Sequence, residues 1–193
     1  MKKKEKAKIL SEAEFNQLLT VTKVGKFAIR NVAILYCSFG LGLPAKEIAS
    51  LTIDDVADAQ YELLDKICLY RKHKKQYYLY LTNKKVHNAL ADHLMNMKDM
   101  GRNKPFFQTQ RRKEFRPDVL QKLFRKLYDD AGIFDASSHS GRQTFITRLI
   151  EHGVSIKMVS QLAGHANIAT TTLYCAENDN SDSLQNIVDL AVF

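Results

Sequence analysis

The sequence predicts a mainly α-helical domain of the α+β class with one small antiparallel β-sheet. Apolar residues recur at helical spacing through most of the chain, whereas residues 66–82 are rich in aromatic and branched residues on both sides of a basic turn. The chain has 193 residues, 45% hydrophobic and 26% charged, which suits one well-packed domain with a short arm.

Composition limits the classes of partner and cofactor. A net charge of +8 and a pI near 9.3 favour an anionic partner, most commonly nucleic acid. Cys37, Cys68 and Cys175 lie far apart without a C-x-x-C pair, so the sequence predicts inert thiols rather than disulfides or a zinc site. No apolar run approaches the roughly 20 residues of a membrane span, and the start lacks the apolar core of a signal peptide. We therefore expect a cytoplasmic protein without membrane contact.

The first part of the chain is predicted to form a basic arm followed by two helices. Residues 1–10 carry five lysines, which indicates a flexible cationic arm that is either a plain tail or a weak contact for phosphates. Ser11 and Glu14 have the spacing of a capping box, so a helix is expected to begin there. A second helix is expected over residues 24–39. Its apolar face would consist of Ile29, Val32, Ala33, Leu35 and Tyr36.

Helix breakers, a hairpin and two more helices come next. Gly40 and Gly42 are expected to end the second helix, and Pro44 to open the next one in its first turn. Residues 66–82 are predicted to form a β-hairpin. Residues 83–100 are then expected to form a helix, followed by the buried residues Phe106 and Phe107, a basic connector and a helix over residues 117–131.

Residues 139–174, HSGRQTFITRLIEHGVSIKMVSQLAGHANIATTTLY, contain the candidate site. A helix is predicted to start near His139 and to end at Gly153. Its expected cap is one of three residues, Asp135, Ser137 or Ser138. His139 and Arg142 are three residues apart, so they share one face of the opening turns, where the helix dipole attracts a phosphate.

His165 and Tyr174 follow a further predicted helix that ends before Gly164. His165 is expected at a turn, and Tyr174 on a short helix capped by Asn167. A cation, two imidazoles and a phenol are the groups needed to break a phosphodiester without a metal. Each residue alone also fits ordinary packing or ion pairing. A DNA-binding helix-turn-helix is an alternative, but it gives no reason for the spacing of His165 and Tyr174.

Three segments together resemble the tyrosine recombinases, the family of phage integrases and fimbrial-switch invertases. HSGRQTF is similar to the family's H-x-x-R-H-T-F box, and LAGHANIATTTLY to its L-G-H-x-x-x-x-T-T-x-x-Y box, with nine residues from His165 to Tyr174. GLGLPAKEIASLTIDD is similar to the segment G-L-R-x-x-E-L-x-x-L-x-x-x-D. The resemblance extends from about Ser11 to the C-terminus and implies the fold of the family's catalytic domain over residues 11–178.

The resemblance implies site-specific DNA recombination by strand cleavage and rejoining, with no cofactor and no metal. Tyr174 would be the nucleophile that forms a 3′-phosphotyrosyl link, and Arg142, His139 and His165 would act on the phosphate and its protons. The family places a catalytic lysine in the hairpin. Lys72 matches that place, and its close rivals are Lys74 and Lys75.

One position departs from the family pattern in a way that bears on catalysis. Pro44 stands in register with the family's first catalytic arginine, so one of the arginines that would hold the phosphate is missing. Lys46 is the cation two residues farther on. Gly141 and Gln143 also replace the family's usual leucine and histidine. The sequence therefore leaves two functions open: a recombinase, or a DNA-binding accessory or regulatory protein that has lost cleavage. A type IB topoisomerase shares the chemistry but usually has a longer chain.

The implied partner is double-stranded DNA, bound by a homo-oligomer that forms a tetramer in the synapse. Contacts with the DNA backbone are expected from basic residues of the hairpin and of the connector, although a solvated surface explains the connector equally well. These residues are Arg71, Lys74, Lys75, Arg111, Arg112 and Lys113. No separate core-binding domain is recognisable, so a helper protein is a further expected partner. The apolar tail, residues 179–193, is expected to dock on a neighbouring protomer or to fold back on its own domain.

Overall fold

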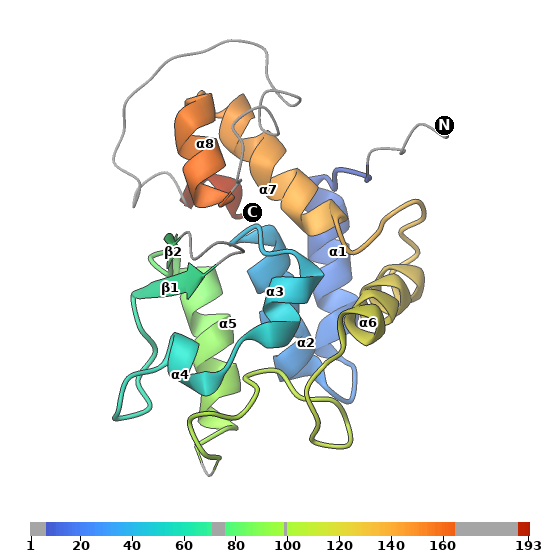
Figure 1. Cartoon of the computed structure of the whole chain (residues 1–193). Coiled ribbons are helices and arrows are strands. Elements are labelled where there is room, and N and C mark those ends of the chain that lie inside the picture. The colour runs from blue at the N-terminus through green and yellow to red at the C-terminus, as the bar shows by residue number, and fades with distance from the viewer. Residues whose placement is uncertain (1–6, 71–75, 99, 165–188) are drawn as a thin grey trace.

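The computed structural model describes residues 7–70, 76–98, 100–164 and 189–193 (Figure 1). A mainly helical chain with one two-stranded sheet confirms the predicted fold class. The elements in chain order are α1 (Glu12–Lys23), α2 (Ala28–Phe39), α3 (Ala45–Ser50), α4 (Ile53–Val56), β1 (Lys66–Tyr70), β2 (Gln76–Tyr80), α5 (Lys84–Met95), α6 (Pro117–Asp130), α7 (Ser140–Glu151) and α8 (Ile156–Leu162).

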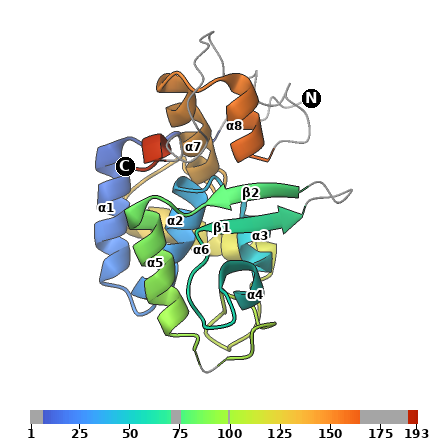
Figure 2. The same ribbon diagram turned by 90° about the vertical axis from the view of Figure 1, so that its left-hand side faces the viewer.

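Helix α2 is the centre of the molecule. It packs against α1, α5 and α7, while α6 packs against α1 and α3 (Figures 1 and 2). The hairpin of β1 and β2 lies beside α4 and beneath α8, so the sheet joins the lower helices to the end of the molecule formed by α7 and α8. This arrangement brings segments from the first, middle and last thirds of the chain to the N-terminal half of α7.

The predicted capping box forms at the start of α1. Ser11 Oγ accepts a hydrogen bond from the backbone N–H of Glu14 at 3.3 Å, and the Glu14 carboxylate accepts one from the N–H of Ser11 at 2.9 Å. Lys8 pairs with Glu14 at 2.7 Å. Leu10 is buried, and its N–H donates to Thr144 Oγ1 on α7 at 3.0 Å, so this end of the arm is attached to the core.

The predicted start of the second helix was wrong by four residues. Helix α2 begins at Ala28 rather than at residue 24, because Val24 is itself the C-cap of α1 and Gly25 lies in the connecting turn. Val24 is 85% exposed and Ile29 is 50% exposed, so neither belongs to the core. The other predicted apolar residues of α2 are buried or half-buried on the inner face.

The predicted hairpin is confirmed. Strands β1 and β2 pair antiparallel, with Ile67 opposite Leu79 and Leu69 opposite Tyr77. Ile67, Leu79 and Tyr77 are buried, which fixes the register because a one-residue slip would expose all three. The turn between the strands, residues 71–75, lies outside the described residues.

The middle of the chain also follows the prediction, with one shorter helix. Helix α5 ends at Met95 rather than near residue 100, because Asn96 caps it and a turn follows. Phe106 and Phe107 are fully buried, as predicted, with His93 stacked on the Phe107 ring at 5.0 Å. Burial lowers the pKa of His93 to about 4, so its ring is neutral at pH 7 and can be buried in these apolar surroundings.

Gly141 of α7 lies directly against α2. A Cβ atom at this position would lie 2.2 Å from Oγ of Ser38 and 2.9 Å from a ring carbon of Phe39. The leucine that the family box has at this position would not fit between these helices. Glycine therefore replaces it because α7 lies so close to α2.

We expect Gly141→Ala to lower the free energy of unfolding by about 1–2 kcal/mol, because overpacking outweighs the ~1 kcal/mol that alanine gains in helix propensity. Urea unfolding followed by circular dichroism measures this. Ser38→Ala should be nearly neutral alone, since its buried hydroxyl has no hydrogen-bond partner within the described ranges. When Gly141→Ala and Ser38→Ala are combined, the loss in the free energy of unfolding should be smaller than in Gly141→Ala alone. A double variant as unstable as Gly141→Ala would refute the steric explanation.

Candidate active site

Arg142, on the third residue of α7, connects two distant parts of the backbone. Its Nη1 donates to the carbonyl oxygen of Gly42 at 2.5 Å, and its Nη2 donates to that of Ala163 at 2.7 Å. Gly42 lies in the loop between α2 and α3, and Ala163 caps the end of α8. The side chain is half-buried, so the two carbonyls hold the guanidinium plane in one orientation.

The start of α7 differs from the predicted capping. His139 is the N-cap, with helical φ and ψ angles of −94° and −12°, and no side chain caps the helix there. Ser137 Oγ instead accepts from the N–H of His139 at 3.3 Å, and Ser140 Oγ accepts from the N–H of Ser137 at 2.9 Å. The hydroxyls of this loop therefore stabilise the turn before the helix. His139 is exposed at the end of α7 that carries Arg142.

The loop that contacts Arg142 also contains the vacant family position. Gly42 has φ +63°, and a Cβ there would lie 2.5 Å from the Phe145 ring, so only glycine can aim this carbonyl at Arg142. Pro44, two residues farther on, is the N-cap of α3 with an extended backbone. Lys46 is exposed, and no hydrogen bond or ion pair ties it to any residue in the described ranges.

Tyr77 attaches the hairpin to the same place. Its hydroxyl donates to the carboxylate of Glu47 on α3. Its ring covers Gly164, where a Cβ would lie 2.8 Å from a ring carbon and where φ is +58°. The segments that adjoin Pro44, the hairpin turn and His165 in the chain thus converge around Arg142.

Several predicted site residues lie outside the described residues. These are Tyr174, His165, Lys72, Arg71, Lys74 and Lys75. Their roles stay predictions. The structure describes the residues next to them in the chain. Gly164 precedes His165, and Tyr70 and Gln76 flank the hairpin turn.

The basic connector between α5 and α6 forms an exposed turn. The N–H of Thr109 donates to the carbonyl of Lys113 at 2.8 Å, and Arg112 has φ +56° in this turn. Arg111, Arg112 and Lys113 are all exposed. In Figure 1 the connector, coloured yellow-green, lies at the end of the molecule away from α8. Contact of these three residues with DNA stays a prediction.

The last five residues pack against their own chain. Ala191 and Phe193 are buried, the Phe193 ring lies 5.2 Å from the Phe15 ring, and the Arg148 guanidinium lies 3.9 Å above it. Lys85 donates to the Phe193 carbonyl oxygen. Folding back is therefore the arrangement that the described part of the tail adopts. Docking of the tail on a neighbouring protomer stays a prediction.

The cysteines and acidic residues do not suggest a metal site. Cys37 is fully buried, and burial raises the pKa of its thiol, which is therefore inert. Within the described ranges no three histidine, cysteine, aspartate or glutamate residues are grouped to hold a metal ion. Within the same ranges no helix is long and apolar enough to cross a bilayer.

Sequence reasoning missed the role of Tyr77 and Glu47. Glu47 belongs to the segment that resembles the family, but its hydrogen bond with Tyr77 joins residues 30 positions apart. The two carbonyls at Arg142 are 100 and 21 positions away from it. Only the two glycines, Gly42 and Gly164, gave a signal, since glycine just after a helical pattern indicates a special backbone conformation.

Known proteins match this chain along most of its length. The model of the phage integrase family matches residues 8–181. A tyrosine recombinase XerD of Oceanobacillus iheyensis is 27% identical over 172 residues, which are 86% of this chain and 56% of that protein. The TnP I resolvase of Bacillus thuringiensis is 32% identical over 166 residues, 83% of this chain and 54% of that protein. The chain thus spans about half the length of these relatives.

Solved structures agree in fold. A crystal structure of XerA recombinase superposes with a TM-score of 0.76 at 27% identity, covering 92% of this chain and 63% of that one. XerH site-specific recombinase bound to its difH substrate has a TM-score of 0.70 at 19% identity, covering 88% of this chain and 50% of that one. On the family match across nearly the whole chain, this protein belongs to the phage integrase family of tyrosine recombinases.

Proposed function

We propose that this chain is a site-specific DNA recombinase that cleaves and rejoins double-stranded DNA through Tyr174. The observation that carries the proposal is the convergence at Arg142. Its guanidinium is held between the carbonyls of Gly42 and Ala163, so it is oriented before any substrate binds. Tyr77 brings the hairpin, and Gly164 brings the chain that leads to His165, to the same place.

In the proposed reaction the Tyr174 hydroxyl attacks a scissile phosphate. A P–O bond to the tyrosine forms as the P–O5′ bond breaks, leaving a 3′-phosphotyrosyl link and a 5′-hydroxyl on the cut strand. A 5′-hydroxyl of the partner strand then attacks that link and releases the tyrosine. One phosphodiester replaces another in each step, so no nucleotide is needed as an energy source.

The other residues act on charge and protons. Arg142 donates its fork of N–H groups to the non-bridging oxygens as negative charge builds on them. Lys72 protonates the leaving 5′ oxygen, His139 takes the proton of the attacking phenol, and His165 hydrogen-bonds the phosphate. The proposal also includes assembly of the protein into a homo-oligomer on the DNA, together with a helper protein.

A second function is favoured by one observation. Pro44 provides neither a charge nor an N–H group where the family has an arginine, and loss of one preorganised donor typically costs about 100- to 1000-fold in rate. The chain would then bind DNA as an accessory or regulatory protein of the same fold without cutting it. The covalent intermediate distinguishes the two functions.

The test uses nicked duplexes in which the sequence around the nick is randomised, because the target sequence is unknown. A short fragment diffuses away after cleavage, so a covalent protein–DNA adduct accumulates and is seen on a denaturing gel. We expect an adduct with the wild type and none with Tyr174→Phe. Duplex binding without any adduct would instead support the accessory function. Relaxation of supercoiled plasmid without sequence preference would indicate a type IB topoisomerase.

A further inference from the structure

Helix α6 has a polar stripe opposite its buried face. Asp118, Gln121, Lys122 and Arg125 recur at intervals of three and four residues and therefore share one side of the helix. The other side is buried in the core. Its residues are Leu120, Phe124, Leu127 and Tyr128. The amphipathic pattern fixes the orientation of the helix, so the polar stripe is held in one direction.

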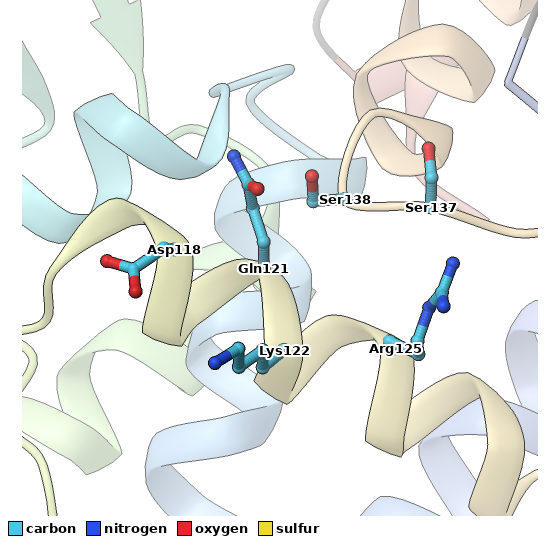
Figure 3. A pocket seen from close by; sticks show the side chains of 6 residues that line it. All are labelled: Asp118, Gln121, Lys122, Arg125, Ser137 and Ser138. Atoms are coloured by element: carbon cyan, nitrogen blue, oxygen red, sulfur yellow. The ribbon is translucent and has the colours of Figure 1, made fainter.

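Together with two serines, this stripe lines a pocket of about 330 Å³. Ser137 and Ser138 come from the loop before α7, and the side chains of Arg125 and Gln121 extend from α6 toward them (Figure 3). Ser138 is only 8% exposed. Its hydroxyl makes no hydrogen bond with any residue that the structure describes.

The charge of the pocket is positive. Asp118 is paired with Arg116 at 3.1 Å, and the neighbouring Lys126 is paired with Asp130 at 2.8 Å. Lys122 and Arg125 have no acidic partner among the described residues. Two cations without an acidic partner and the hydroxyl of Ser138 fit an anion that has several oxygen atoms. Phosphate matches this set, because a guanidinium binds two of its oxygens and a hydroxyl binds a third.

The pocket lies at the same end of α7 as Arg142. Ser138 immediately precedes the N-cap His139, and Arg142 lies in the first turn, roughly 4.5 Å along the helix axis from that cap. One duplex in contact with Arg142 therefore reaches the pocket as well, since successive phosphates of a strand are only about 3.4 Å apart along the axis.

We propose that this pocket binds a second phosphate of the DNA backbone and so positions the scissile phosphate at Arg142. The inference rests on the proposed function. It assigns a binding role to Arg125, Lys122 and Ser138, none of which takes part in the proposed chemistry. The pocket supplies affinity and register, whereas cleavage stays with Arg142 and Tyr174.

Fluorescence anisotropy with a labelled duplex of arbitrary sequence, over a series of salt concentrations, tests the proposal. Arg125→Ala should weaken binding about 10-fold and lower the slope of log K against log salt by about one. Ser138→Ala should weaken binding a few-fold without changing the slope, because a hydroxyl releases no counterion. Lys126→Ala is the matched control: it removes the adjacent cation of α6, which does not line the pocket, and should change affinity less than 2-fold.

Three outcomes would overturn the inference. If Arg125→Ala and Lys126→Ala weaken binding equally, only diffuse charge acts. If inorganic phosphate at millimolar concentration binds the wild type, and Arg125→Ala abolishes phosphate binding but leaves DNA binding unchanged, the pocket is a site for the free ion. If the wild type binds no duplex, the proposed function fails too. Thermal melting shows whether Ser138→Ala folds, and the result for the exposed Arg125 does not depend on that variant.

Discussion

Replacement of Arg142 by alanine is expected to reduce the rate of adduct formation at least about 1000-fold, because it removes both the charge and the fork of donors from the scissile phosphate. It also removes the two hydrogen bonds to the carbonyls of Gly42 and Ala163. We therefore expect a loss of about 2 kcal/mol in the free energy of unfolding. Single-turnover kinetics on a nicked duplex at saturating protein measures the first effect, and urea unfolding the second.

Arg142→Lys separates these two effects. Lysine keeps the charge but not the planar fork, so it cannot bind both carbonyls and a phosphate oxygen. We expect duplex binding close to that of the wild type, with cleavage still reduced about 100-fold. Cleavage at the wild-type rate in either variant, with folding intact, would show that Arg142 is only a structural link between α7, α8 and the loop before α3.

Pro44→Arg is expected to raise the rate of cleavage about 100- to 1000-fold by restoring the missing donor. Pro44 has φ −71° and ψ 151°, an extended conformation open to any residue, so arginine needs no backbone change. The substitution lies two residues from Gly42, whose carbonyl contacts Arg142. The new side chain therefore starts in the loop that already contacts the guanidinium of Arg142.

Ser50→Arg is the matched control for this gain. It adds the same side chain to the exposed end of α3 and should raise nonspecific DNA binding without a large change in the first-order rate of cleavage. If Pro44→Arg has no more effect than Ser50→Arg, the vacancy does not limit the reaction. Other residues would then hold the scissile phosphate in place of the missing arginine.

Local signals predicted most of the fold. The capping box at Ser11 and Glu14, the breaker Gly40 and the burial of Phe106 depend on neighbours in sequence, and all three appear in the structure. The start of α2 was missed because apolar spacing continues through Val24, whereas the turn at Gly25 depends on how α1 ends.

The candidate site was less predictable because its geometry comes from long-range contacts. The family boxes identify Arg142, but nothing local indicates that its side chain binds the carbonyls of Gly42 and Ala163. The polar stripe of α6 is visible in the sequence as a helical repeat, yet its pocket also needs Ser138 from another segment. Residue types and spacing thus predict what a site contains, while packing decides which of its groups meet.

The identity of the amino acid joined to DNA tests the central claim most directly. After nuclease digestion of the adduct and proteolysis of the protein, mass spectrometry locates the residue that carries the nucleotide. We predict attachment to Tyr174 alone, in the wild type and in Pro44→Arg. A nucleotide attached to any other residue, or an adduct that persists in Tyr174→Phe, would contradict the proposal that Arg142 and Tyr174 form one active site.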